Sequence, residues 1–296
     1  MISSVAVIGL GNVASRHRKN LKLRFAGVKV LAMSASGRKV DEIINNADQI
    51  VESIQEIIDV KPDFVIVASP STHHAKHAVV LLEKNIPVLI EKPVTASLND
   101  ANKLKVASQI NQTPLAVAYC LRYLSSSCEM KRVLSESLIG NVYNAFVSVG
   151  QFLPEWRDNK GFRSSVSANK FLGGGVLLEL SHELDYIQWL LGDMTFQHAQ
   201  LRTSHELDLE VEEIADLVLT SVKGVVCNVH LDFLQKQARR VCVLIGSKGR
   251  LEWDLIENSI MLHNAEGSFT IYSRPEWDKN EMYLAMVDDF VAMMNK

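Results

Sequence analysis

The sequence predicts an α/β protein in two parts: an N-terminal doubly wound parallel sheet, and a C-terminal α+β domain with an open, mostly antiparallel sheet. Up to Tyr119, short apolar segments alternate with segments of helical polarity, which is typical of parallel strands with helices on both faces. After Tyr119, longer segments of alternating polarity follow one another across short turns, which indicates antiparallel pairing. No repeat or low-complexity linker intervenes, so the predicted domains are 1–120 and 121–296.

The first part contains five predicted strands, each followed by a polar or helical segment. Several are apolar on both faces, as expected of strands inside a parallel sheet. The strands are expected at 4–11, 27–34, 63–70, 87–90 and 114–119. Helical segments are expected at 13–25, within 39–59 after a polar loop, at 73–85, and at 97–111 with Ser97 as the N-cap.

The second part begins with a predicted helix at 125–137 and a strand at 142–152. A glycine-rich turn and helix are expected at 173–191. The remaining segments have the length and alternation of antiparallel strands. They lie at 213–222, 224–234, 239–247, 249–256, 259–264 and 268–272.

Composition excludes several classes of protein. The chain has 296 residues, 47% hydrophobic and 22% charged, with a net charge of −3 and no basic stripe, so no nucleic-acid partner is expected. No apolar run reaches membrane-spanning length, and the residues after Met1 do not resemble a signal peptide, so no membrane association is expected. The four cysteines show no CxxC pair or zinc spacing, which indicates reduced thiols and a cytoplasmic location.

A glycine motif follows the first strand and opens a helix. Gly9-Leu10-Gly11-Asn12-Val13-Ala14 is GxGxxA, the dinucleotide (Rossmann) fingerprint in its required setting. Gly9 permits the tight turn, Gly11 lets the backbone approach a pyrophosphate, and Ala14 keeps the helix close to the sheet. The N–H groups at Asn12 and Val13 begin a helix whose N-terminus attracts phosphates. The alternative is a structural glycine turn without a ligand.

The end of the second strand favours NADP over NAD. An NAD site usually has a carboxylate there, on the ribose hydroxyls. This sequence instead supplies two hydroxyls and two cations, at Ser34, Ser36, Arg38 and Lys39. An arginine fork suits a 2′-phosphate. The alternative is that Arg38 and Lys39 are ordinary solvated loop charges.

The strand at 87–90 ends in Glu91-Lys92-Pro93, which is unusual for a plain strand terminus. Ligands of open α/β sheets bind outside the carboxyl ends of the strands. The triplet is therefore expected to present the ammonium group of Lys92 to a nicotinamide. The alternative is a surface lysine after a strand.

With these motifs and the later Gly173-Gly174-Gly175, nearly the whole chain resembles the Gfo/Idh/MocA family, the glucose–fructose oxidoreductase and inositol dehydrogenase family. The resemblance implies an NAD(P)-dependent oxidoreductase that transfers a hydride between nicotinamide and a secondary alcohol or ketone of a sugar, including nucleotide-linked or acidic sugars. It also implies a homodimer or homotetramer formed through the C-terminal sheet. In the family the peptide bond matching Lys92–Pro93 is often cis.

The resemblance also assigns residues by motif. It implies a catalytic set of Lys92, His182 and Glu179, where the family commonly has Asp in place of Glu179 and places the histidine one residue later. Either spacing is expected to put the two groups on one helical face. It implies cofactor contacts at Ser69, Pro70, Ser71, His74, Glu91, Lys92 and Arg122.

The chemistry of these side chains suggests their roles. His182 is expected to act as the base, because imidazole titrates near working pH. Lys92 is expected to hydrogen-bond the reacting oxygen and stabilise its developing charge. Glu91 is expected to orient Lys92, and Glu179 to position the substrate or Lys92. The alternative for His182 is a structural helix histidine beside the glycine turn.

The segment 152–175 has no regular period and is predicted to be a long functional loop. A tryptophan face suits a sugar ring, and arginines suit phosphates or carboxylates. The predicted substrate-binding residues are Tyr119, Trp156, Arg157, Arg163 and Asp185. The alternative is a solvated crossover loop.

No metal site is expected at the histidines of the segment 73–77. His73 and His77 can share a helical face, but no third ligand lies nearby in the sequence. His230 and His263 are expected to be ordinary strand residues.

Leu217, Leu219, Val229 and Leu231 are predicted to supply the dimer face of the sheet. The alternatives to the sugar dehydrogenase are a non-catalytic NAD(P)-binding sensor, which Lys92 and His182 argue against, and an enzyme that reduces an imine or a linear tetrapyrrole.

Overall fold

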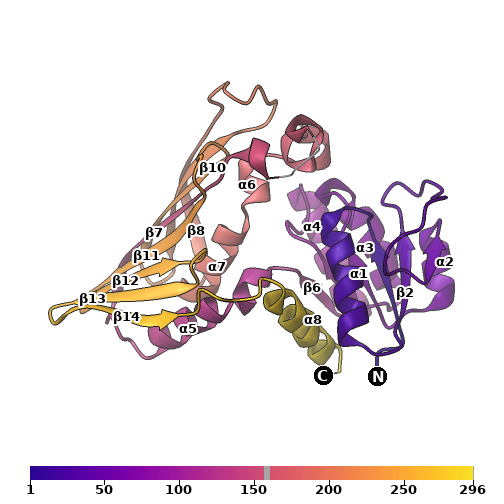
Figure 1. Ribbon diagram of the computed structural model, residues 1–296, viewed down its shortest axis with the longest axis horizontal. Coiled ribbons are helices and arrows are strands. Elements are labelled where there is room, and N and C mark those ends of the chain that lie inside the picture. Colours follow the sequence, from indigo (N-terminus) through magenta and orange to yellow (C-terminus); the bar gives the residue numbers. More distant parts are fainter. Residues whose placement is uncertain (157–160, 296) are drawn as a thin grey trace. The chain divides into compact units, whose positions relative to one another are not determined.

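The computed structural model describes residues 1–156 and 161–295, and the chain divides into two compact units. Unit 1 contains Met1–Tyr119, Phe171–Gly173 and the described chain from Tyr283 onward. Unit 2 contains the described residues of Cys120–Lys170 and Gly174–Met282 (Figure 1). The chain passes between units after Tyr119, close to the predicted boundary, but two later segments return to unit 1, which the sequence analysis did not anticipate.

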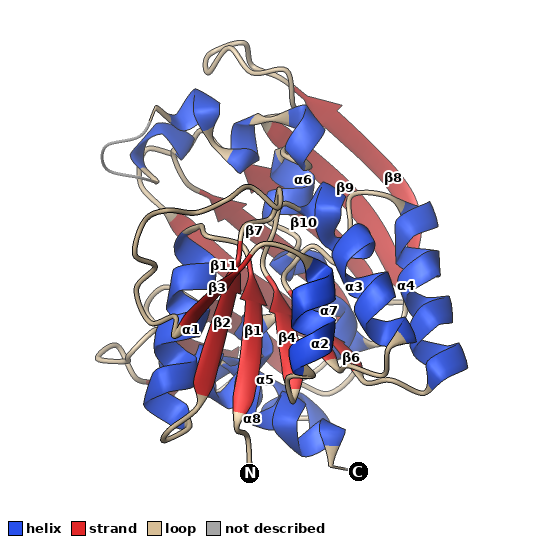
Figure 2. Ribbon diagram, turned by 90° about the vertical axis from the view of Figure 1, so that its right-hand side faces the viewer, coloured by secondary structure: helices blue, strands red, loops and turns tan. Residues whose placement is uncertain are grey.

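Unit 1 is built on a six-stranded parallel sheet with the order β3-β2-β1-β4-β5-β6 (Figure 2). The strands are β1 (Ser4–Ile8), β2 (Lys29–Met33), β3 (Gln49–Val51), β4 (Phe64–Val67), β5 (Val88–Ile90) and β6 (Leu115–Val117). Strand β1 pairs with β2 on one side and β4 on the other, so the order reverses beside β1. The prediction of a doubly wound sheet is confirmed, and the reversal marks the edge where ligands of such sheets bind.

Helices cover this sheet on both faces (Figure 2). They are α1 (Asn12–Arg24), α2 (Ile54–Val60), α3 (His74–Glu83), α4 (Leu98–Asn111) and α8 (Glu281–Met294), with a short 3₁₀ turn η1 (Ser71–His73) before α3. The Ser97 hydroxyl accepts the backbone N–H of Asp100, which confirms the predicted N-cap of α4. Helix α8 joins unit 1 through Phe290, whose ring meets Phe64 edge to face at 5.5 Å.

Unit 2 is built on an eight-stranded sheet with the order β14-β13-β12-β11-β7-β10-β9-β8. Among the described strand pairs of this sheet, only β7–β10 is parallel, as predicted for a mostly antiparallel sheet. The strands are β7 (Val142–Gly150), β8 (Met194–Arg202), β9 (Ile214–Ser221), β10 (Val226–Asp232), β11 (Arg239–Gly246), β12 (Gly249–Asp254), β13 (Ser259–Asn264) and β14 (Gly267–Ser273).

The helices of unit 2 lie on one face of this sheet (Figure 1). They are α5 (Ser125–Ser135), α6 (Val176–Glu179) and α7 (His182–Leu191). The 3₁₀ turns of unit 2 are η2 (Cys120–Tyr123), η3 (Leu153–Glu155), η4 (Phe162–Ser164) and η5 (Val166–Ala168), and η6 (Lys170–Leu172) leads into unit 1. Between the helices and the sheet, Tyr186 packs edge to face on Trp253 at 5.1 Å, and both side chains are fully buried. The core of unit 2 lies on this covered face.

The other face of the sheet is open, and its residues are not those predicted. Leu217, Leu219, Val229 and Leu231 are 7%, 8%, 2% and 0% exposed, so they belong to the covered core. Because side chains alternate along a strand, the open face carries their neighbours, among them Asp216 and His230. The prediction that the four apolar residues form a dimer face is therefore wrong, because they lie on the covered face of the sheet.

Two strands, one helix and one helix break were missed: β3, β8, α8 and the break between α6 and α7. Strand β3 has three residues inside a polar stretch, and β8 is an edge strand whose side chains are mostly exposed, so neither shows clear alternation. The predicted helix at 173–191 is interrupted: α6 ends at Glu179 and α7 begins at His182. Glu179 and His182 therefore do not share one helical face.

Candidate active site

The glycine turn after β1 has one closed and one open position. Gly9 has φ +124°, and a Cβ there would lie 2.3 Å from the carbonyl oxygen of Ala68, so only glycine fits. Gly11 has φ −74°, and apart from its two chain neighbours no described residue has an atom within 4 Å of where its Cβ would be. Gly11 therefore leaves space for an approaching ligand.

This space lies at the N-terminus of α1. Gly11 is the N-cap residue, no side chain caps the helix there, and the first turn contains no acidic residue. The N–H groups and the positive end of the helix dipole are thus available to an anion. Ala14 is fully buried, which lets the helix lie close to the sheet. These residues fit the pyrophosphate of a dinucleotide.

The loop after β2 carries the predicted specificity residues. The hydroxyls of Ser34 and Ser36 lie 3.2 Å apart. Arg38 forms an ion pair with Glu42 at 3.3 Å, and Lys39 lies 3.7 Å from Asp41. All four charged side chains are well exposed, and exposed pairs contribute at most about 1 kcal/mol. Both cations can therefore exchange these partners for a phosphate.

A buried histidine joins the loops that follow β4 and β5. His74 is 1% exposed, and its Nε2 lies 2.7 Å from the carbonyl oxygen of Ser69. Its Nδ1 lies 3.0 Å from the carbonyl oxygen of Pro93. His74 was predicted to line the nicotinamide half of the cofactor. Since both ring nitrogens face backbone carbonyls, the structure places it as a support of the two loops.

A second histidine supports the loop after β4. Nδ1 of His77 lies 3.1 Å from the hydroxyl of Ser69. Burial lowers the pKa of His77 to about 4, and the neighbouring His73 and Lys76 act in the same direction. A ring with this pKa is neutral at physiological pH, so His77 adds no charge beside the loop.

The glycine-rich segment reaches the same loop within unit 1. The hydroxyl of Ser71 donates to the carbonyl oxygen of Leu172 at 3.4 Å, and Thr72 donates to that of Phe171 at 3.3 Å. A Cβ at Gly173 would lie 2.0 Å from the Ser71 hydroxyl oxygen. Residues about 100 positions apart in sequence are thereby brought together at a predicted cofactor-binding loop.

The Glu91-Lys92-Pro93 triplet directly follows β5, and the Lys92–Pro93 peptide is cis. Oε1 of Glu91 lies 2.7 Å from Nε2 of His17, and its Oε2 accepts the backbone N–H of Lys92 at 3.2 Å. Burial raises the pKa of the Glu91 carboxyl, but the bond to His17 and the positive charge of Lys92 outweigh burial and hold the pKa below its usual value. Glu91 is therefore a buried carboxylate beside the predicted catalytic lysine.

His17 and its neighbour Arg18 are buried polar residues of α1 that were not predicted. The buried residues of α1 include Ala14, His17, Arg18 and Leu21, at the spacing of a core-facing stripe. Arg18 is 3% exposed and donates to the carbonyl oxygens of Gly9 at 3.2 Å and Asn45 at 3.1 Å. The sequence signal that could have identified them is a pair of polar residues at core-facing positions of the helix. Buried polar groups require hydrogen-bond partners, so such residues indicate a contact with another part of the chain.

In unit 2, Arg122 and Asp185 pair with each other. The guanidinium Nε and Nη2 donate to the two carboxylate oxygens at 2.8 and 2.6 Å, and the Asp185 side chain is 7% exposed. Arg122 was predicted to bind the cofactor and Asp185 the substrate. Their two-bond contact fixes η2 to α7, so each orients the other.

The other predicted substrate-binding residues lie in separate surroundings. Trp156 packs edge to face on Phe233 at 5.4 Å. Arg163 donates to the carbonyl oxygen of Leu207 at 3.1 Å. Tyr119 follows β6, at the end of the unit 1 segment. Arg157 lies outside the described residues.

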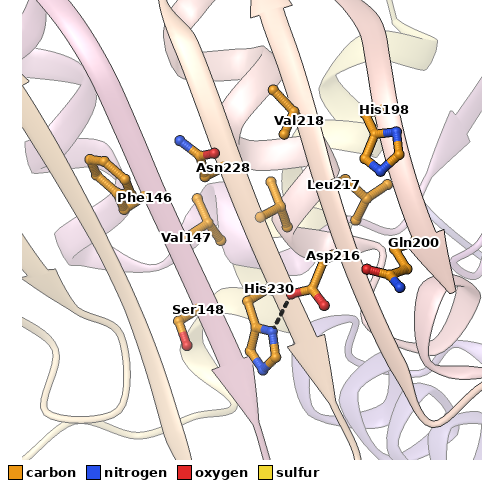
Figure 3. A pocket seen from close by; sticks show the side chains of 11 residues that line it. Phe146, Val147, Ser148, His198, Gln200, Asp216, Leu217, Val218, Asn228 and His230 are labelled. Atoms are coloured by element: carbon orange, nitrogen blue, oxygen red, sulfur yellow. Dashed lines mark hydrogen bonds and ion pairs between the residues drawn. The ribbon is translucent and has the colours of Figure 1, made fainter. Parts of the chain in front are cut away.

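The open face of unit 2 contains a hollow of about 330 Å³ between β7, β10, β9 and β8 (Figure 3). His230 lies there between two carboxylates, with Nδ1 2.6 Å from Asp216 and Nε2 3.1 Å from Asp232. The bonds to Asp232 and Asp216 raise the pKa of His230 to about 9 despite partial burial. His230 was expected to be an ordinary strand residue; it is the centre of a charged cluster instead.

Across the described residues, no group of three or more His, Cys, Asp or Glu side chains is arranged to hold a metal ion. In the same part of the chain, no helix has the length and hydropathy needed to cross a membrane.

The reversed strand order of the parallel sheet and the glycine turn that opens α1 define a dinucleotide-binding fold. The chain belongs to the Gfo/Idh/MocA family: residues 3–119 match the model described as oxidoreductase family, NAD-binding Rossmann fold, and residues 128–252 match the GFO/IDH/MocA C-terminal domain.

Curated relatives share about a quarter of their residues with this chain. Inositol 2-dehydrogenase 1 of Saccharopolyspora erythraea is 27% identical over 281 residues, covering 88% of this chain and 77% of the relative. The 1,5-anhydro-D-fructose reductase of Ensifer adhaerens is 25% identical over 249 residues, covering 82% and 72%. Among solved structures, a levoglucosan dehydrogenase in complex with NADH and levoglucosan superimposes with a TM-score of 0.85 at 17% identity, covering 99% of this chain and 90% of that one. This last likeness concerns the fold.

Proposed function

We propose that the protein is an NAD(P)-dependent dehydrogenase or reductase that interconverts a secondary alcohol and a ketone of a sugar or cyclitol. The observation that carries the proposal is the anchored triplet after β5. Glu91 is fixed by His17 and bonded to the backbone of Lys92, at the same carboxyl edge of the sheet as the open position at Gly11. The named activities of the relatives, on inositol and on 1,5-anhydro-D-fructose, support this class of substrate.

The bound nicotinamide supplies hydride transfer to or from the substrate carbon. Lys92 hydrogen-bonds the reacting oxygen and stabilises the negative charge that develops on it. His182 takes the hydroxyl proton during oxidation and returns it during reduction. Glu179 positions the substrate. The paired Arg122 and Asp185, with Tyr119, Trp156, Arg157 and Arg163, complete the proposed contacts to cofactor and substrate.

The proposed cofactor is NADP. Between Met33 and Val40 the chain offers no carboxylate for the ribose hydroxyls. The Ser34 and Ser36 hydroxyls and the exposed cations of Arg38 and Lys39 instead suit a 2′-phosphate. The neighbouring structure that contains NADH makes NAD the alternative.

The protein is also proposed to be cytoplasmic and to assemble as a homodimer or homotetramer through the open face of the unit 2 sheet. Phe146 and Ile245 are 44% and 37% exposed on neighbouring strands of this face. Large apolar side chains on an open sheet favour burial against a partner.

The test compares Lys92→Ala with Lys84→Ala, an exposed lysine after α3. NADPH and NADH binding is titrated by nicotinamide fluorescence, and turnover is followed by nicotinamide absorbance with myo-inositol, levoglucosan, 1,5-anhydro-D-fructose and sugar nucleotides. Lys92→Ala is expected to lower kcat at least about 100-fold, because it removes a charged donor to the transition state, with cofactor affinity retained. Wild-type turnover in Lys92→Ala, with Lys84→Ala also normal, would refute the mechanism. Cofactor binding without turnover on any substrate would favour the sensor alternative.

A further inference from the structure

His17 is one of the buried polar residues of unit 1 that the mechanism above does not use. It lies on α1, six residues after Gly11, and is fully buried on the helix face that packs toward the sheet. An apolar side chain at this position would fill the core without a need for hydrogen bonds. A buried imidazole instead costs free energy unless it has a partner. That partner is Glu91, 74 residues away.

The geometry assigns the direction of this hydrogen bond. Nε2 of His17 lies 2.7 Å from Oε1 of Glu91, and Nδ1 of His17 is buried without a hydrogen-bond partner. A carboxylate only accepts, so the ring carries its proton on Nε2 and donates. The opposite tautomer would place two acceptors against each other and bury an N–H group with no acceptor. The ring is held in place by Tyr283, which meets it edge to face at 6.2 Å.

The second carboxylate oxygen of Glu91 contacts Lys92. Oε2 accepts the backbone N–H of Lys92 at 3.2 Å, so the carboxylate bridges the His17 ring and the Lys92 peptide. On the far side of the triplet, the Pro93 carbonyl faces His74. The backbone that carries Lys92 is thereby fixed on both sides by buried histidines.

We propose that His17 is a positioning residue of the reaction: by donating to Glu91 it keeps that carboxylate charged and directed at the Lys92 backbone, and so fixes where the Lys92 ammonium group lies. This proposal rests on the proposed role of Lys92. Without the donor, Glu91 would be a buried carboxylate with one unsatisfied oxygen, and it would take a proton or turn away. Either change removes a negative charge beside Lys92 and frees its backbone. The phosphate cradle at Gly11 does not depend on the bond.

The test uses His17→Leu, which fills the core without a donor, and His17→Gln, whose amide N–H can donate to Glu91. His17→Leu is expected to lower kcat about 10- to 100-fold, as expected of a displacement of about 1 Å in a catalytic group, with the Kd of the cofactor changed less than about twofold. His17→Gln is expected to recover most of the loss. Thermal denaturation accompanies both variants. Equal losses of kcat in the two folded variants would overturn the proposal. A merely structural role would not depend on whether the side chain at position 17 can donate a hydrogen bond to Glu91.

A double-variant comparison tests the path through Glu91. If His17 acts through the carboxylate, His17→Leu combined with Glu91→Gln should be no slower than Glu91→Gln alone. Losses that multiply in the double variant would overturn the proposal.

A measurement without substrate separates this inference from the proposed function. Acetylation of Lys92 by a dilute active ester is followed by mass spectrometry, with the exposed Lys103 as internal reference. Lys92 is expected to react at least about threefold faster in His17→Leu than in the wild type, and close to the wild-type rate in His17→Gln, because release of the Lys92 backbone from Glu91 leaves the amine less fixed and easier for the ester to reach. Unchanged labelling in His17→Leu would overturn the role of His17 even if Lys92 proves catalytic. Altered labelling in His17→Leu, together with normal turnover in Lys92→Ala, would support the contact from His17 through Glu91 to Lys92 and would refute the proposed function.

Discussion

Replacing Gly11 with alanine should separate cofactor binding from folding. The backbone of Gly11, with φ −74° and ψ −177°, is extended and open to any residue, and apart from the two chain neighbours no described residue has an atom within 4 Å of the added Cβ. Loss of a glycine N-cap and reduced freedom of the unfolded chain act in opposite directions, each by about 0.5–1 kcal/mol. The free energy of unfolding should therefore change by less than about 0.5 kcal/mol.

Cofactor affinity should respond quite differently. The new methyl group occupies the space through which a pyrophosphate approaches the N-terminus of α1. Displacing the phosphates loses one charge-assisted hydrogen bond, worth about 1.5–3 kcal/mol. The Kd for NADPH or NADH, measured by nicotinamide fluorescence, should rise about 10- to 100-fold.

Two glycine-to-alanine variants serve as controls for Gly11→Ala. At Gly9, φ is +124° and the added Cβ would lie 2.3 Å from the Ala68 carbonyl oxygen, so Gly9→Ala should lose roughly 2–4 kcal/mol of stability. At Gly161, φ is −50° and no described atom lies within 4 Å, so Gly161→Ala should change neither property. Wild-type affinity in a folded Gly11→Ala protein would refute the assignment of the phosphate cradle.

Three further outcomes are expected. Arg38→Glu should weaken NADPH binding about 10- to 100-fold and leave NADH within about twofold, since only the 2′-phosphate loses a charged donor; Lys105→Glu is the control, and equal changes for both cofactors would count against the NADP proposal. The folded-state pKa of His230 is about 9, above its ordinary value of 6.5, so the stability from its protonated ring is complete below pH 6.5 and is lost as pH rises through 9. The Tm of the wild type should therefore fall toward that of His230→Asn over this pH range. If the Tm of the two proteins changes in parallel with pH, the charged cluster around His230 does not contribute to stability as expected. Phe146→Glu should reduce the mass in sedimentation to that of a monomer, with Ile256→Glu unchanged; an unaltered assembly would exclude this face as the interface.

The sequence predicted elements wherever their pattern is local. Strand β1, the glycine turn and α1 follow from an apolar run, two glycines and a helical stripe. The cap of α4 follows from Ser97 alone. Strand β8 was missed because an edge strand with exposed side chains has no apolar alternation to read. The break at Leu180–Ser181 was missed because the apolar spacing continues through it.

Contacts between distant segments could not be predicted in the same way. The pattern of β9 and β10 gave the alternation but not which set of side chains the helices cover, so the predicted open face was the buried one. His230 looked ordinary because its partner Asp216 lies across the strand pair.

The sequence by itself determined the doubly wound sheet, the dinucleotide turn and a lysine at the end of β5, because these depend on residues within a few positions of one another. Tertiary structure alone decided that His17 meets Glu91, that His74 supports two loops, and that Arg122 is paired with Asp185. A buried polar side chain must find its partner wherever the folded chain places one, and that choice is made by packing across tens of residues.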